Sequence, residues 1–227
     1  AGFPLGDPEF TLTRGIVSKA RANGDTDWAS VDRVIEHDAT INPGNSGGPL
    51  VTGDGKVVAV NYAGDSDAGQ FFAIAPAQAL PVIEQLRERT DVLAIGINGT
   101  AINDGEGLSG IWVSSVESGS PASRAGVEPG DIITELEGLV LATDGTLADY
   151  CDILRSRAPD DVMAIEVLRF NTEEVLEGEL NGNPLQLAFS FAQQLSDEAT
   201  TTEEGAAESY TDYVSISDDT GTLTMDV

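Results

Sequence analysis

The sequence of 227 residues contains few basic side chains: 11 lysines and arginines stand against 39 aspartates and glutamates, which leaves a formal net charge of −28. A protein that binds nucleic acid by neutralising phosphates needs the opposite balance, so this class is excluded. Cysteine and histidine are equally scarce, with Cys151 and His37 as the single examples. Because they can form neither an intrachain disulfide nor a zinc site, we expect no metal and no cofactor.

Long hydrophobic runs are missing as well. No stretch approaches the roughly 18 apolar residues that a membrane-spanning helix requires. Residue 1 is an alanine that begins no signal peptide, so we expect any targeting segment or membrane anchor to lie upstream. Hydrophobic residues still make up 41% of the chain, and its length allows one or two hydrophobic cores. The 25 glycines, spread along the chain with the prolines, indicate many turns and hence mainly β structure.

Residues 1–90 predict short strands followed by a helix. Strands are expected at 11–20, 31–38, 49–52, 57–62 and 71–75, the third and fourth joined by the turn Gly53-Asp54-Gly55. Residues 81–89 predict a helix, because Pro81 suits a first helical turn and apolar residues follow at helical spacing. A helix after several strands indicates the end of a domain.

Residues 91–182 predict a second domain with two short helices among strands at 111–116, 132–136 and 163–170. Ser120 as cap, Pro121 at the first helical position and Gly126 past the end define the first helix. The second is expected to open with a capping box formed by Thr146 and Asp149. One face of this helix is apolar and carries Leu147, Tyr150, Cys151 and Leu154.

The last part of the chain changes composition again. We assign residues 183–209 to a strand and an acidic linker, since 196–209 contain no aromatic or aliphatic anchor beyond alanine. Alternating apolar residues then resume, and 210–227 predict a hairpin. A lone hairpin is barely stable in water, so we expect it to begin a further β domain that is truncated here.

The strongest chemical signal is the glycine-dense loop at 42–50, with Ser46 between small residues. Glycines allow the backbone to bend until the amides of Gly44 and Ser46 converge on a developing oxyanion, and the Ser46 hydroxyl is then a candidate nucleophile. The alternative is an ordinary β-turn, which explains most glycine clusters of this kind.

Residues 44–49 resemble the nucleophile loop of trypsin-like serine proteases, and residues 38–51 narrow the resemblance to the HtrA/Deg group. Three further motifs resemble that group in the expected order: Gly2-Phe3-Pro4-Leu5-Gly6, Thr13-Arg14-Gly15-Ile16-Val17-Ser18 and Phe72-Ala73-Ile74-Ala75-Pro76. The resemblance implies that residues 1–90 form part of a trypsin-like second β-barrel, with Ser46 as nucleophile and the amides of Gly44 and Ser46 as oxyanion hole.

The same resemblance assigns Thr40 to the floor of the primary specificity pocket. An uncharged floor favours small or medium apolar side chains over Lys and Arg, although Asp65 or Asp67 could still supply a carboxylate. His37 lies only nine residues before Ser46, whereas the family's catalytic base and its aspartate come from the first β-barrel, well upstream. We therefore interpret His37 as a strand or rim residue and expect a chain that is catalytically incomplete by itself.

Residues 91–182 resemble a PDZ domain of the HtrA type, which implies a small antiparallel β-sandwich with two helices, an α+β fold. The motifs are Gly110-Ile111-Trp112-Val113, Gly119-Ser120-Pro121-Ala122, Ala125-Gly126-Val127 and Pro129-Gly130-Asp131-Ile132-Ile133. Ala94, Ile95, Gly96 and Ile97 resemble the loop whose amides hold a peptide carboxylate while the peptide adds as a strand. A strand glycine at a bulge is the alternative for Gly96.

Two functional hypotheses follow. The first is a serine endopeptidase that cleaves unfolded or damaged proteins in the cell envelope, periplasmic or extracellular, with the PDZ domain binding peptide C-termini. The second is a non-proteolytic peptide-binding scaffold that carries a degenerate protease lobe. For the first, the family resemblance also implies a homo-oligomer assembled through an N-terminal region outside this chain.

Overall fold

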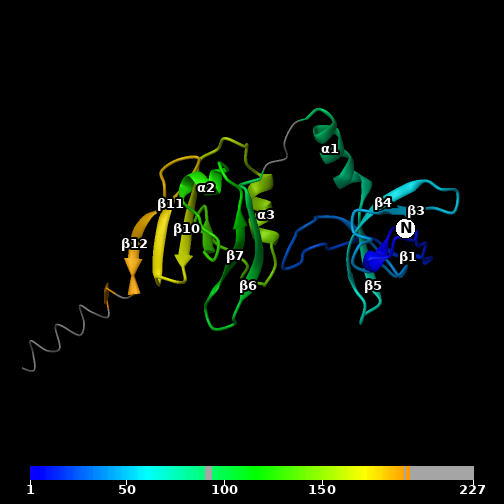
Figure 1. The fold of residues 1–227 in the computed structure, drawn as a ribbon, viewed down its shortest axis with the longest axis horizontal. Coiled ribbons are helices and arrows are strands. Elements are labelled where there is room, and N and C mark those ends of the chain that lie inside the picture. Colours follow the sequence, from blue (N-terminus) through cyan, green and yellow to red (C-terminus); the bar gives the residue numbers. More distant parts are fainter. Residues whose placement is uncertain (90–93, 192, 195–227) are drawn as a thin grey trace, which may run out of the picture. The chain divides into compact units, whose positions relative to one another are not determined.

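The computed structural model describes residues 1–89, 94–191 and 193–194. Its N-terminal part contains a five-stranded antiparallel sheet with the strand order β1-β2-β5-β4-β3 (Figure 1). The strands are β1 (Val17–Ala22), β2 (Val34–His37), β3 (Pro49–Val51), β4 (Val57–Asp65) and β5 (Gln70–Ile74). The mainly β character expected from the sequence is confirmed. β1 begins at Val17 and not at residue 11, because residues 12–16 have no partner strand within the described chain.

The helix that follows this sheet, α1 (Pro76–Arg87), starts five residues earlier than expected. The sequence interpretation was wrong because Pro76, and not Pro81, takes the first helical turn, where a missing N–H has no intrahelical partner to lose. Pro81 instead lies inside the helix and removes one internal hydrogen bond. The apolar spacing after Pro81 therefore marked only the C-terminal half of α1.

The next part of the chain forms a second antiparallel sheet, with the order β12-β11-β10-β8-β7-β6 and β9 paired to β8. Its strands are β6 (Ile97–Asn103), β7 (Ser109–Val116), β8 (Ile132–Leu136), β9 (Leu139–Val140), β10 (Met163–Arg169), β11 (Glu174–Leu180) and β12 (Gln186–Ser190). Buried aliphatic side chains such as Val113, Ile133 and Val167 form its core. The core also includes Leu147 and Leu154, from the segment of the second helix.

Two helices accompany this sheet, α2 (Pro121–Ala125) and α3 (Ala148–Arg155). The expected limits of α2 are confirmed: the Ser120 hydroxyl accepts a hydrogen bond from the Ser123 N–H at 3.2 Å, and Gly126 adopts the left-handed conformation with φ 95°. The expected capping box of α3 is wrong. Leu147 occupies the cap position without a side-chain bond, and the Thr146 hydroxyl instead accepts a hydrogen bond from the Ala148 N–H at 3.2 Å.

The acidic linker expected at 196–209 and the hairpin expected at 210–227 lie outside the described residues. The contacts within the chain divide it into two compact units after Ala188, within β12. None of the helices in the described ranges has the length and apolar character needed to cross a membrane.

Candidate active site and peptide-binding loop

The loop that carries Ser46 is built from tight turns. The Asn45 N–H donates to the Asn42 carbonyl and the Gly48 N–H donates to the Asn45 carbonyl, both at 2.9 Å. The Gly47 N–H then donates to the Asn61 carbonyl at 2.8 Å, which fixes the loop to β4. These bonds use the backbone groups on either side of Ser46 and hold the loop in one conformation.

Two amides of this loop remain unused. Among the described residues, neither the Gly44 N–H nor the Ser46 N–H has a hydrogen-bond partner. Gly44 has φ 99°, and a Cβ at this position would lie 2.6 Å from the Phe3 carbonyl oxygen, so the position requires glycine. The Leu5 N–H donates to the Pro43 carbonyl at 2.7 Å and braces the same turn. The backbone therefore presents two free donors two residues apart, as an oxyanion hole requires.

The nucleophile candidate itself is exposed. The Ser46 hydroxyl donates to the Tyr62 carbonyl on β4 at 3.3 Å, so it is bonded to backbone and not to a base. The Tyr62 side chain is 8% exposed; its hydroxyl donates to the Gly24 carbonyl at 2.9 Å, and its ring lies 5.0 Å from that of Trp28. Tyr62 thus joins the loop around Gly24 to β4, and its carbonyl on that strand accepts the hydrogen bond from Ser46. The sequence pattern did not reveal this role.

His37 lies on β2 and is 2% exposed, and neither of its ring nitrogens has a hydrogen-bond partner. Its ring stacks on Phe71 at 6.2 Å. Burial lowers the pKa of the imidazole below its usual value, with the nearby charge of Asp38 acting in the opposite direction. The structure shows no hydrogen bond between His37 and Ser46.

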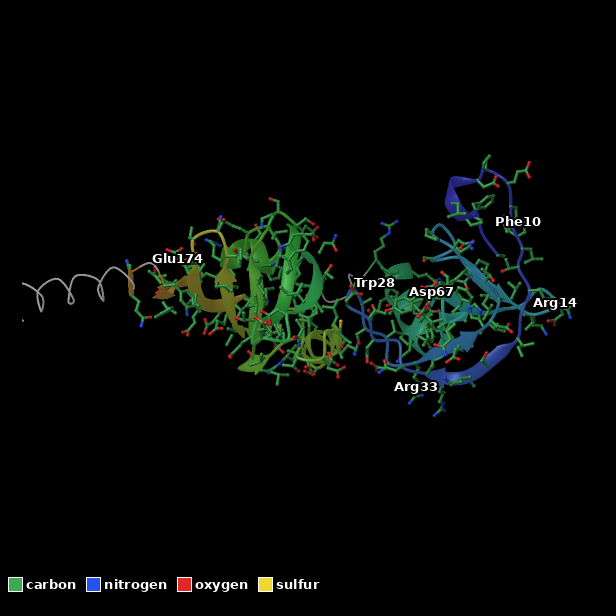
Figure 2. The ribbon with its side chains drawn as sticks, turned by 90° about the horizontal axis from the view of Figure 1, so that it is seen from below. Phe10, Arg14, Trp28, Arg33, Asp67 and Glu174 are labelled. Carbon is green, nitrogen blue, oxygen red and sulfur yellow. The ribbon has the colours of Figure 1, made fainter. Side chains whose placement is uncertain are left out.

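Thr40, expected at the floor of the specificity pocket, is exposed, and its role there stays a prediction. Of the two aspartates that could supply a carboxylate, Asp65 accepts hydrogen bonds from the N–H groups of Asp67 and Ala68 at 2.9 and 3.0 Å. These bonds close the turn between β4 and β5, near the Asp67 label in Figure 2. Asp65 therefore has a structural use as a turn-forming residue.

The loop Ala94–Ile97 leads into β6, the end strand of the second sheet. Gly96 has φ 81°, and a Cβ there would lie 2.1 Å from the Ser120 Cβ. The Ile95 carbonyl accepts a hydrogen bond from the Ala122 N–H at 3.0 Å, which fixes the loop against α2. The N–H groups of Ile95 and Gly96 bond to no other described residue. Gly96 precedes the strand, so it is not a bulge glycine within β6.

Within the described ranges, no group of three or more His, Cys, Asp or Glu side chains is placed to hold a metal ion. Cys151 lies partly buried on α3, where burial raises the pKa of its thiol and so opposes formation of a thiolate.

Comparisons with known proteins match the two sheets of this chain to two different domain families. Residues 1–60 match the trypsin-like peptidase domain family, and residues 112–169 match the PDZ domain family. The chain is thus a trypsin-like lobe followed by a PDZ domain.

Two curated relatives extend the similarity over most of the chain. A serine protease Do-like HtrA of Bacillus subtilis is 33% identical over 76% of this chain and 43% of its own length. A probable periplasmic serine endoprotease DegP-like of Rickettsia conorii is 30% identical over 89% of this chain and 42% of its own length. A solved HtrA-type protease, AlgW with a decapeptide, is 32% identical over 81% of this chain and 58% of that one, with a TM-score of 0.42.

The chain belongs to the HtrA/Deg group of PDZ-bearing, trypsin-like serine proteases. It spans less than half the length of these two curated relatives.

Proposed function

We propose that this chain supplies the nucleophile, the oxyanion hole and a peptide-binding module of a serine endopeptidase that cleaves unfolded or damaged proteins. The observation that carries the proposal is the pair of free amides at Gly44 and Ser46 beside an exposed serine hydroxyl. The Ser46 Oγ attacks the peptide carbonyl, and the two amides stabilise the oxyanion that forms. The amine leaves to give an acyl-enzyme, which water then hydrolyses.

A base must accept the proton of Ser46 in this reaction. His37 is 2% exposed and makes no hydrogen bond to Ser46, so it is not assigned as that base. We propose that the base and its orienting carboxylate come from outside these 227 residues. Incubation of the chain alone with casein and a fluorophosphonate probe should then give neither cleavage nor stoichiometric labelling. Labelling that is lost in Ser46→Ala would show that a base exists within the chain.

The proposed protease activity itself is tested with an enzyme that includes the first β-barrel. It should cleave casein, and Ser46→Ala should abolish the activity. The cut sites should follow small or medium apolar residues such as Val and Ala, because a Lys or Arg side chain over Thr40 would lie without a counter-charge. A majority of cuts after basic residues would refute the role of Thr40 and point to Asp65 or Asp67.

The rival function is a peptide-binding scaffold with a degenerate protease lobe. It is favoured by the bond of the Ser46 hydroxyl to the Tyr62 carbonyl in place of a base. The upstream sequence separates the two functions, since a His and an Asp in a first β-barrel support the enzyme and their absence supports the scaffold.

For the PDZ domain we propose binding of peptide C-termini at Ala94, Ile95, Gly96 and Ile97, supported by the free amides of Ile95 and Gly96. Calorimetry with a peptide acid and its amide tests this proposal, and equal affinities would reject it. We also propose a cell-envelope location, supported by the periplasmic naming of the Rickettsia conorii relative. Homo-oligomerisation through an N-terminal region remains a prediction.

A further inference from the structure

The outer face of the second sheet carries a row of apolar side chains. Trp112, Ile132, Leu168 and Val175 lie directly opposite one another on the neighbouring strands β7, β8, β10 and β11 (Figure 1). The residues that alternate with them along the strands point into the core. Trp112 is 42% exposed, Leu168 and Val175 are half-buried, and Ile132 between them is buried. An apolar row with an exposed aromatic ring on a solvent-facing surface indicates an interaction site.

A row of acidic side chains runs beside the apolar row. Glu135, Glu166 and Glu177 lie directly opposite one another on β8, β10 and β11. On β10 and β11 each glutamate is two residues from the apolar row, which is about 7 Å along the strand. Like charges at opposed positions destabilise a sheet. Within the described ranges none of these three carboxylates pairs with a lysine or arginine, and the Thr134 hydroxyl donates to Glu166 at 2.6 Å.

A hollow of about 440 Å³ lies over the acidic row. Its lining includes the same three glutamates together with Glu179, Ala164 and Gly138. Ala164 and Gly138 have side chains too small to fill the space between the carboxylates. This space can take ammonium or guanidinium groups from outside. Lysine and arginine also lay their apolar stems along apolar surface while the charged end stays polar, and the row that begins at Trp112 offers such a surface.

The direction of the two rows determines the form of the partner. Both rows run across the strands, and the backbones of these strands are already paired with one another, so a partner cannot add here as a further strand. Neighbouring strands are about 4.8 Å apart, and helix side chains at i and i+3 or i+4 are about 5–6 Å apart. A helix is also about 10 Å wide, so one helix covers both rows. The four strands span about 14 Å, which corresponds to about ten helical residues.

The charge of this chain determines where the helix comes from. A helix that complements the acidic row needs several lysines or arginines on one side, and the whole chain has 11 such residues against 39 acidic ones. The helices α1, α2 and α3 contain a single arginine each and no lysine. Neither these helices nor a second copy of them can supply the basic stripe, so the partner is another protein.

We propose that the two rows bind a basic amphipathic helix of about ten residues from another protein. Its apolar stripe covers the row from Trp112 to Val175, and its lysines or arginines enter the hollow over the row from Glu135 to Glu177. The site uses the outer face of the sheet, so it depends neither on the protease activity nor on the carboxylate binding proposed above for Ala94–Ile97.

The test uses the whole chain and the helical peptide acetyl-Leu-Lys-Lys-Leu-Leu-Lys-Leu-Leu-Lys-Lys-Leu-Leu-Lys-Leu-amide. Its leucines and lysines form two stripes at helical spacing, and its amidated end offers no carboxylate to the Ala94–Ile97 loop. Titration followed by NMR should shift the indole signal of Trp112 and leave that of Trp28, the other tryptophan of the chain. Trp112→Phe identifies the signal by removing it.

A triple variant tests the acidic row. It should bind the peptide at least about tenfold more weakly, which is about 1.4 kcal/mol. Loss of like charges at opposed positions favours the fold, so unfolding does not explain a weaker affinity. The matched control removes three exposed glutamates outside the second sheet, for the same change in net charge, and should change the affinity by no more than about twofold. The triple variant is Glu135→Gln, Glu166→Gln and Glu177→Gln, and the control is Glu9→Gln, Glu84→Gln and Glu88→Gln.

The apolar row has its own variant. Trp112→Thr keeps a residue that favours strands but removes the aromatic anchor, and the peptide should bind at least about tenfold more weakly. An unchanged affinity would overturn the proposal.

Three further results would also overturn it. Equal weakening in the two triple variants would show attraction by net charge alone. A peptide that shifts the amide signals of Ile95 and Gly96 in place of the Trp112 indole would bind at the carboxylate loop. Spermine, a polycation without apolar side chains, should bind at least about tenfold more weakly than the peptide, because it lacks the apolar contacts. An equal affinity for spermine would assign the hollow to small cations.

Discussion

The close approach of Gly96 to Ser120 makes the Ala94–Ile97 loop sensitive to substitution of this glycine. Gly96→Ala adds the cost of a positive φ, about 1–2 kcal/mol, and a contact of 2.1 Å with the Ser120 Cβ. We expect a total loss of about 3 kcal/mol or more in the free energy of unfolding. Gly119→Ala is the matched control, because Gly119 has φ 79° but nothing within 4 Å of the added Cβ. Equal losses in urea denaturation would contradict the importance of the contact.

His37 should make the first lobe sensitive to mild acid. Burial lowers its pKa in the folded state, so the unfolded chain binds more protons near its ordinary value of about 6.5. The stability from the neutral imidazole is complete above that value and is lost as pH falls from it towards the lower folded pKa. Each pH unit in this window removes up to about 1.4 kcal/mol. His37→Val should remove this part of the pH dependence, as measured by urea denaturation from pH 7.5 to 5; an unchanged slope would refute it.

Among the strands, β8 and β10 are joined by an ion pair between a buried carboxylate and a partly buried guanidinium. Arg169, the last residue of β10, donates from Nε and Nη2 to the two carboxylate oxygens of Asp131, just before β8, at 3.0 and 2.9 Å. The Asp131 side chain is 3% exposed. Because Asp131→Asn leaves Arg169, only 19% exposed, without its main counter-charge and weakens the hydrogen bonds of a buried carboxylate, it should cost about 2–3 kcal/mol.

The matched control for this pair is Glu137→Gln, which removes one partner of the more exposed pair with Arg157. Exposed pairs contribute less than about 1 kcal/mol. Chemical denaturation of the three proteins should therefore place Glu137→Gln close to the unmodified chain. Similar losses in both variants would mean that burial does not decide the contribution of the Asp131 pair.

Local signals in the sequence were sufficient for some elements and not for others. Ser120 and Gly126 define α2 correctly because caps act on adjacent backbone groups. Pro81 misled the prediction of α1, since a proline that would suit a first helical turn lies here inside the helix, where it removes an internal hydrogen bond. The Ser46 loop was recognisable as a motif, whereas the bond from Tyr62 to Gly24 joins residues 38 apart and leaves no local pattern.

At the scale of the whole molecule, the formal charge of −28 should make stability depend on ionic strength. Like charges repel in the compact state, and salt screens them over a Debye length of about 10 Å at 0.1 M. We expect the melting temperature to rise between 0.05 and about 0.5 M NaCl, as followed by circular dichroism. KCl should act equally, because screening does not distinguish the cations. A rise with only one of the salts would indicate specific ion binding instead.

The attachment of the Ala94–Ile97 loop to α2 has a thermodynamic consequence for any ligand. Ile95 and Gly96 are fixed by the Ala122 N–H and by contact with Ser120, so their backbone loses its conformational freedom when the domain folds. Fixing a residue costs about 1–2 kcal/mol of entropy, and here that loss precedes the arrival of a peptide. In the proposed binding of a peptide carboxylate, the amides of Ile95 and Gly96 are already ordered, so the conformational entropy that remains to be lost on association is mainly that of the peptide.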